Sequence, residues 1–321
     1  MIWNRYHRNI IDASKKDQMS IHSLSKSHAI TTTTEKLCKT FGNFNKNVHI
    51  IRNMFDWQLP QWNLNISDTR QQMLPEWFPS TDNKIVIGWA GLTSHFEDLR
   101  KMYSILKVIH DRYPQTVFVL AGMALKDSQV EIQYDENGQA KFREMELQDK
   151  SLTYRNRVEK LYSGIDPKRI KIFDALPLEE YAKFYTLFDI SLAYVEHNTF
   201  SECKSEIKLI ESLYYGAVPV FSNYGGYHDF WKTVPDKLRF ENMAVSVTAP
   251  KVWTDAISKH VENFEESKKK AADLKVYSDK VYDLNEHIEE RFAFYLNQME
   301  KHEEEEVNRI SRYSVDGFKI V

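Results

Sequence analysis

The stretch from Lys204 to Phe221 predicts a helix, a glycine stop and a buried strand in direct succession. Apolar side chains recur along its first part at helical spacing, so one face of the helix would pack on a sheet. These side chains are Ile207, Ile210, Leu213 and Tyr214. Gly216 stands where a helix commonly ends. The apolar run from Ala217 to Phe221 is typical of a strand that is covered on both sides, as in an α/β fold.

The opposite face of this predicted helix carries charge. Lys204, Lys208 and Glu211 lie at positions i, i+4 and i+7, so a continuous helix would place them on one face. Two ammonium groups and a carboxylate at a helix start suit a ligand that carries both phosphate and a hydroxylated sugar. The competing interpretation is an exposed ladder of charges that contributes little to stability. The buried strand that follows directly favours the ligand site.

Strands and helices are predicted to alternate through residues 84–264. Strands are expected at residues 84–90, 116–122, 170–173, 189–195, 217–221 and 243–248. Helices are expected at residues 96–112, 152–162, 178–187 and 250–264. A surface hairpin is predicted between residues 130–134 and 141–143, with its turn at 135–138. This alternation implies parallel β-α units in a doubly wound sheet.

In such sheets, ligands bind beyond the carboxyl ends of the strands. Three loops are predicted to lie at that edge: residues 91–95, 196–200 and 223–226. The first contains Thr93, Ser94 and His95 and precedes a helix, an arrangement that binds phosphate through backbone N–H groups. The other two contain His197 and Gly225. A single loop histidine is more often a surface residue than a catalytic one, and this alternative stays open for both histidines.

Charge and cysteine content restrict the class of protein. A formal net charge of −3 argues against a protein that coats nucleic acid. Cys38 and Cys203 are the only cysteines, so no disulfide framework exists and a reducing, cytoplasmic location is expected. No apolar run reaches the roughly 18 residues needed to cross a bilayer. No His or Cys cluster has the spacing of a metal site, so we expect none.

The two ends of the chain differ from its middle. Ser27 to Thr34 predicts a strand that runs into a helix capped by Thr34, and Val48 to Asn53 predicts a second strand. Residues 56–83 hold tryptophans and prolines with little periodicity and are predicted to be a linker. Beyond Glu265 the chain is expected to be helical and highly charged.

One pattern resembles a known family. Lys204-Ser205-x-x-Lys208-x-x-Glu211, followed by Gly-x-Pro-Val, is similar to the donor-site helix of GT-B glycosyltransferases, in particular the group 1 (family 4-like) enzymes. The turn from Trp89 to His95 resembles the one before the first helix of their donor domain. The two N-terminal strands resemble the end of their N-terminal domain. The family often has an acid eight positions before Glu211, where this chain has Cys203 and, one residue out of register, Glu202.

The resemblance implies a GT-B fold with a Rossmann-like donor-binding domain, a partial second α/β region and C-terminal helices. We expect residues 1–83 to be a remnant of the acceptor-side domain with a linker. Residues 84–264 would form the donor-binding domain, and residues 265–321 the charged helices. The chain would then carry the donor-binding half and only the tail of the acceptor-binding half.

The resemblance also implies transfer of a sugar from a nucleotide-diphosphate sugar, without a metal or other cofactor. Lys204 would neutralise the departing diphosphate, with His95 as a second catalytic candidate. Glu211 would accept hydrogen bonds from the ribose. The remaining donor-binding candidates are Thr93, Ser94, His197, Ser205, Lys208 and Gly225.

Two functions stay open at this point. The first is an active glycosyltransferase, with a glycan, a protein or a modified nucleic acid as acceptor. The second is a non-catalytic sugar-nucleotide-binding or scaffold subunit. The retained donor-site pattern favours the first, and the short N-terminal region favours the second. A homo-oligomer or a complementary N-terminal-half chain is an expected partner in either case.

Overall fold

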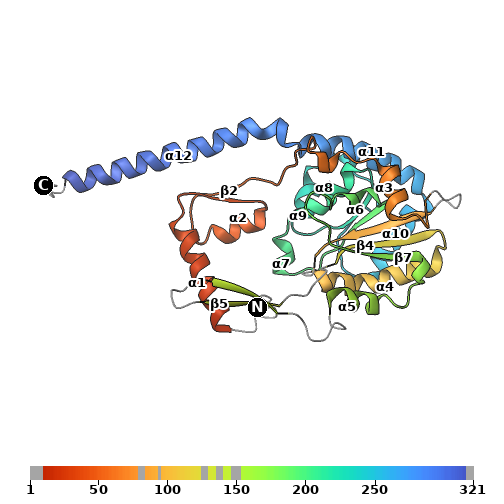
Figure 1. Cartoon of the computed structure of the whole chain (residues 1–321). Helices are drawn as coiled ribbons and strands as arrows, with labels where there is room; N and C mark the ends of the chain where they lie inside the picture. Colours follow the sequence, from red (N-terminus) through yellow and green to blue (C-terminus); the bar gives the residue numbers. More distant parts are fainter. Residues whose placement is uncertain are drawn as a thin grey trace. The chain divides into compact units, whose positions relative to one another are not determined.

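The computed structural model describes residues 10–78, 84–92, 95–123, 129–134, 140–145 and 153–315 (Figure 1). The chain divides into two compact units. Unit 1 comprises Met1–Asp56, Asn198–Ser205 and Tyr282–Val321. Unit 2 comprises Trp57–His197 and Glu206–Val281.

Unit 2 contains a parallel sheet. Its strands are β3 (Ile85–Ala90), β4 (Thr116–Met123), β7 (Ile170–Asp174), β8 (Ile190–Ala193), β9 (Val218–Ser222) and β10 (Ala244–Val245). They lie in the order β10-β9-β8-β3-β4-β7, and all pairs are parallel. This sheet confirms the α/β prediction, and the strand expected after Gly216 is β9, which lies inside it between β8 and β10.

The strand order reverses between β3 and β8. From β3 the chain builds outward through β4 to β7, and from β8 it builds in the opposite direction through β9 to β10. In open α/β sheets a crevice forms outside the carboxyl ends of the strands at such a switch point. The loops that leave β3 and β8 therefore flank the place where this fold offers a binding site.

Helices cover both faces of the sheet (Figure 1). On one face α4 (Phe96–Arg112) contacts both α5 (Tyr154–Leu161) and α10 (Pro250–Glu262). On the other face α8 (Ile207–Tyr214) contacts both α6 (Lys183–Thr186) and α11 (Phe264–Val281), and α6 contacts α3 (Ile66–Met73). Helix α9 (Gly226–Thr233) follows β9 directly. Both faces of the central strands are thus buried, which is why β3, β4, β8 and β9 are largely apolar.

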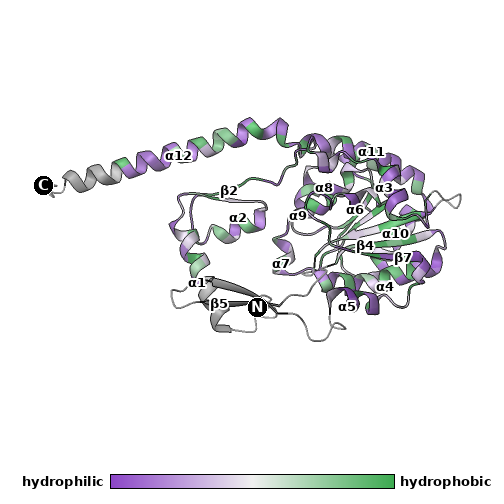
Figure 2. Cartoon of the chain, in the orientation of Figure 1, coloured by the Kyte–Doolittle hydropathy of each residue, from purple (hydrophilic) through white to green (hydrophobic). Residues whose placement is uncertain are grey.

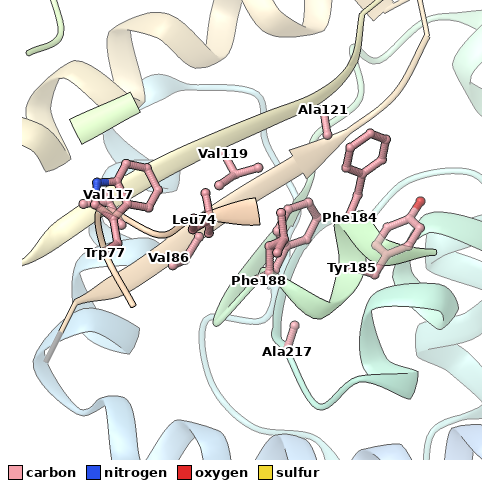
Figure 3. Close-up of a cluster of buried hydrophobic side chains, with 11 residues drawn as sticks. Leu74, Trp77, Val86, Val117, Val119, Ala121, Phe184, Tyr185, Phe188 and Ala217 are labelled. Atoms are coloured by element: carbon pink, nitrogen blue, oxygen red, sulfur yellow. The ribbon is translucent and has the colours of Figure 1, made fainter. Parts of the chain in front are cut away.

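One apolar cluster fills the space between the sheet and α6 (Figure 3). On β4 it includes Val117, Val119 and Ala121, which alternate along the strand and so point to the same face. The other members are Leu74, Trp77, Val86, Phe184, Tyr185, Leu187, Phe188 and Ala217. This cluster holds the strands whose ends carry the candidate site.

A buried ion pair fixes α3 to the start of the sheet. Arg70 Nη2 donates to Asp189 Oδ1 over 2.8 Å, and the other carboxylate oxygen accepts the N–H of Val86 over 2.8 Å. Arg70 Nε also donates to the carbonyl of Thr186. Asp189 is only 5% exposed. Both of its oxygens are therefore committed inside the protein.

The sequence interpretation was wrong about two segments. Residues 56–83 were expected to lack an element, but they contain α3, which begins where Asn65 accepts the N–H of Asp68. The helix expected at 178–187 is reduced to α6, because Glu180 and Tyr181 instead form turns on the carbonyl of Pro177. In both places local hydrogen bonds donated by backbone N–H groups determine where the helix begins. Hydrophobic periodicity does not reveal such bonds.

The expected hairpin is present. Strands β5 (Gln129–Tyr134) and β6 (Ala140–Met145) pair antiparallel, as the sequence predicts. The turn expected at 135–138 lies outside the described residues.

Unit 1 holds a small α/β element. Strands β1 (Ile30–Thr32) and β2 (Val48–Ile50) pair in parallel, and α2 (Glu35–Phe41) connects them. Thr34 caps α2 by accepting the N–H of Leu37, as expected. The described part of the unit also contains the helices α1 (Ile10–Lys26), α7 (Thr199–Glu202) and α12 (Leu284–Val315).

Helix α12 is amphipathic, with hydrophilic and hydrophobic stretches along its length (Figure 2). One side contacts the strands of unit 1, where Gln298 accepts from the Asn47 amide over 3.0 Å and Phe294 packs edge-on against His49. The other side leaves apolar residues exposed. These residues are Ile288, Phe292, Tyr295, Leu296, Met299 and Val307.

Candidate functional site

The segment with the donor-site pattern is not one helix. Helix α7 ends at Glu202 and α8 begins at Ile207, so the expectation that Lys204, Lys208 and Glu211 share a helical face is wrong. Helix α7 starts early because Asn198 caps it by accepting the N–H of Ser201. The border between the two units falls between Ser205 and Glu206.

Lys204 and Ser205 therefore belong to unit 1. The Lys204 ammonium lies 4.9 Å from the centre of the Phe200 ring. Ser205 Oγ accepts from the Asn53 amide over 3.0 Å. Glu202, the acid one residue out of register, pairs with Lys36 over 2.7 Å. In unit 1, Glu202 thus has a cationic partner of its own.

In unit 2 the structure brings Lys208 together with His95. Lys208 Nζ lies 3.1 Å from His95 Nε2. His95 occupies the N-cap position of α4, directly after β3, while Lys208 comes from the first turn of α8. These two predicted site residues, 113 positions apart in sequence, meet at the switch point of the sheet.

Asp98, which is not part of the donor-site pattern, completes this group. Its Oδ2 lies 2.6 Å from His95 Nδ1, and its Oδ1 accepts the N–H of Glu196 over 3.0 Å. His95 is 7% exposed and Asp98 is 4% exposed. Asp98 thus joins the loop after β3 to the loop after β8. The His95-x-x-Asp98 spacing at a helix start was the available signal, because such residues are neighbours in the first turn.

Gly91 makes room for the Lys208 ammonium. A Cβ atom at this position would lie 2.6 Å from Lys208 Nζ and 2.7 Å from the Trp89 ring, too close for either. Lys208 Nζ also lies 4.9 Å from the centre of the Trp89 ring, within the range of a cation–π contact. The ammonium therefore rests against bare backbone at the carboxyl end of β3.

Glu211 lies deeper than the sequence interpretation assumed. It is 4% exposed, and its Oε1 accepts the Tyr181 hydroxyl over 2.6 Å. Burial raises the pKa of Glu211 to about 7, although hydrogen bonds from Tyr181 and Tyr185 and the charge of Lys208 act in the opposite direction. The two tyrosines were not predicted, and only the fold places them beside this carboxylate.

His197 and Gly225 lie in neighbouring loops. The His197 ring stacks on Tyr224, with 4.2 Å between centroids and 16° between planes. Burial lowers the pKa of His197, so its neutral form is favoured. Gly225 has φ 58° and ψ −136°, a backbone conformation that suits glycine, and it immediately precedes α9. Thr93 and Ser94, predicted to bind phosphate, lie outside the described residues.

The described residues contain neither a cluster of metal ligands nor a helix that could cross a membrane. No three His, Cys, Asp or Glu side chains there gather closely enough to hold a metal ion. None of the helices described is both long and apolar enough to span a bilayer.

No protein-family model and no curated protein matches the sequence. Solved structures do match. A glycosyltransferase from Rickettsia africae superposes with a TM-score of 0.59 at 12% identity, over 84% of this chain and 63% of that one. Anabaena HepE, solved with UDP, superposes with a TM-score of 0.56 at 15% identity, over 84% of this chain and 64% of that one. The catalytic domain of Arabidopsis thaliana starch synthase IV, bound to ADP and acarbose, superposes with a TM-score of 0.56 at 10% identity. The match covers 87% of this chain and 57% of that one.

This chain thus spans less than two thirds of each of those three chains. At such low identities the likeness concerns the fold. It agrees with the parallel sheet and the helices that cover it. The chain has the GT-B glycosyltransferase fold.

Proposed function

We propose that the chain binds a nucleotide-diphosphate sugar and transfers the sugar to an acceptor hydroxyl. The observation that carries this proposal is the Lys208 ammonium, held against Gly91 by His95 at the switch point of the sheet. Sugar transfer needs a cation that neutralises the departing diphosphate, and charge-assisted contacts of this kind are strong. The N-terminus of α4 adds backbone N–H groups that favour an anion at the same place.

The other predicted residues receive roles within this proposal. The resemblance assigns Lys204 to the departing diphosphate, with Ser205 as a neutral donor. Glu211 accepts hydrogen bonds from the ribose. The stacked ring of His197 and the backbone at Gly225 line the donor at the ends of β8 and β9. HepE and starch synthase IV, which share the fold, were solved with UDP and ADP.

A second candidate is a binding subunit without catalysis. One observation favours it: Cys203 stands where the family often has an acid. Such a subunit would bind the donor through the same Lys208 and Gly91 but would need another chain to present the acceptor. Donor binding is therefore common to both candidates, and turnover separates them.

The test of donor binding uses Lys208→Ala. Loss of a charge-assisted contact costs about 1.5–3 kcal/mol. This corresponds to roughly 10- to 150-fold weaker binding. We expect such a loss for UDP, ADP, GDP and inorganic diphosphate, whichever of them the parent binds, measured by calorimetric titration. Lys204→Ala is expected to behave similarly.

Lys251→Ala is the matched control, because this lysine on α10 is 85% exposed and pairs with Asp255 one turn away. It should bind like the parent. Equal affinities for parent, Lys208→Ala and Lys204→Ala would contradict the donor site. Thermal midpoints of all variants show whether a loss of binding reflects a loss of fold.

Turnover is measured with labelled UDP-, ADP- and GDP-sugars, alone and with glycan, protein or nucleic-acid acceptors, in buffer containing EDTA. Sugar incorporation supports the transferase, and its persistence in EDTA supports the expectation that no metal is needed. Tight donor binding without incorporation or hydrolysis under any condition favours the binding subunit. The cytoplasm is the expected location of the protein.

A further inference from the structure

We propose that Asp98 is a positioning residue for donor binding: it holds the His95 proton on Nδ1, so that His95 Nε2 accepts from Lys208 and seats the ammonium at Gly91. The effect of Asp98 on donor binding rests on the proposed function. The hydrogen bonds that join Asp98, His95 and Lys208 do not depend on it. It assigns a task to Asp98, which the motif does not include.

The argument starts from Lys208. An ammonium group has three donors and no acceptor. Its Nζ lies 3.1 Å from His95 Nε2, a hydrogen-bond distance, so Nε2 has to be the acceptor. A neutral imidazole with an acceptor at Nε2 carries its proton on Nδ1. That nitrogen faces Asp98 Oδ2 at 2.6 Å, which suits a donor opposite a carboxylate.

Asp98 is itself held in one orientation. Its Oδ1 accepts the N–H of Glu196 over 3.0 Å, which leaves Oδ2 directed at His95. The carboxylate and the imidazole are both buried, so water competes little for either contact. A carboxylate that fixes the tautomer of a histidine is a general device for making the opposite ring nitrogen available. Here the opposite nitrogen serves the donor-binding lysine.

Asp98→Asn is expected to change the tautomer of His95 while the side chain at position 98 keeps nearly the same shape. The amide oxygen would continue to accept from Glu196, and the amide NH2 would then face His95 Nδ1. An NH2 group donates, so the imidazole would move its proton to Nε2. That N–H would point at the Lys208 ammonium, donor against donor, and Lys208 would leave its place at Gly91.

The expected result for Asp98→Asn is about tenfold weaker binding of the nucleoside diphosphate that the parent binds, because a charge-assisted contact loses its geometry. Affinity for the matching nucleoside, which has no phosphate, should stay unchanged. Both are measured by calorimetric titration with UDP, ADP, GDP and their nucleosides.

A spectroscopic readout reports the tautomer directly. Protein labelled with 15N-histidine is examined by 1H–15N correlation at pH 8, and His95→Gln identifies the His95 signals. The parent should show the proton on Nδ1, and Asp98→Asn should show it on Nε2. Glu97→Gln is the matched control: Glu97 lies in the same turn, 55% exposed and paired with Arg100, so tautomer and affinity should match the parent.

A proton on Nε2, or on both nitrogens, in the parent would overturn the inference. So would an Asp98→Asn variant that folds with the tautomer and affinity of the parent. If Asp98→Asn does not fold, the parent spectrum still decides the first point. If the parent binds none of the nucleoside diphosphates, the proposed function fails while the tautomer measurement still decides the role of Asp98.

Discussion

Asp189→Ala is expected to lower the free energy of unfolding by about 3–5 kcal/mol, the cost of breaking a buried ion pair. The substitution leaves the Arg70 guanidinium without its carboxylate and the N–H of Val86 without its acceptor. Both groups lie at the start of the central strands, where α3 meets the sheet. For a domain of this size each kcal/mol lowers the thermal midpoint by roughly 2–4 °C.

Urea denaturation followed by circular dichroism measures this loss. Asp255→Ala is the control: Asp255 pairs with Lys251 at the surface, and both side chains are more than half exposed. Its removal should change the free energy of unfolding by less than about 1 kcal/mol. Asp189→Asn should fall between the two, because it keeps an acceptor for Val86 but loses the charge. An Asp189→Ala protein as stable as the control would show that the pair contributes little.

Glu211→Gln is expected to change how stability depends on pH. In the folded protein the Glu211 pKa is about 7, above its ordinary value of 4.5. The folded state therefore binds more protons than the unfolded state between these values, and the free energy of unfolding falls as pH rises through this window. The full shift corresponds to roughly 3 kcal/mol. Glutamine does not ionise and does not show this fall.

The stability of Glu211→Gln relative to the parent should accordingly rise by roughly 3 kcal/mol from pH 4.5 to pH 8. Urea denaturation of both proteins at intervals of half a pH unit measures the difference. The amide oxygen of glutamine still accepts from Tyr181, so packing changes little. Parallel pH profiles would show that Glu211 ionises in the folded protein as it does in water.

The sequence predicts the central part of the fold well. The bounds of α4 are those expected, and β3 and β4 differ from expectation by one residue. These elements follow from long apolar periodicities that local sequence reports directly. Helix α3 and the break between α7 and α8 were missed. The break depends on contacts distant in sequence, such as that of Ser205 with Asn53, 152 positions away.

The candidate site divides in the same way. Lys208 was predicted from the donor-site pattern and His95 from its position in a loop at the sheet edge. The structure brings the two side chains together. Asp98 and Tyr181 act through contacts that only the folded chain creates. The depth of Glu211 was also missed, because a charged residue on an amphipathic helix is normally read as exposed. The neighbours of Glu211 along α8 cannot reveal that Tyr181, 30 positions away in sequence, contacts its carboxylate.

The chain passes between its two units inside the donor-site pattern itself. It enters unit 1 after His197 and returns to unit 2 after Ser205. A recombinant fragment running from Trp57 to Val281 would consequently carry residues 198–205 away from Asn53 and Lys36, the groups that hold them. Anyone wishing to crystallise unit 2 by itself should replace that segment with a short glycine-serine bridge rather than simply trim the ends.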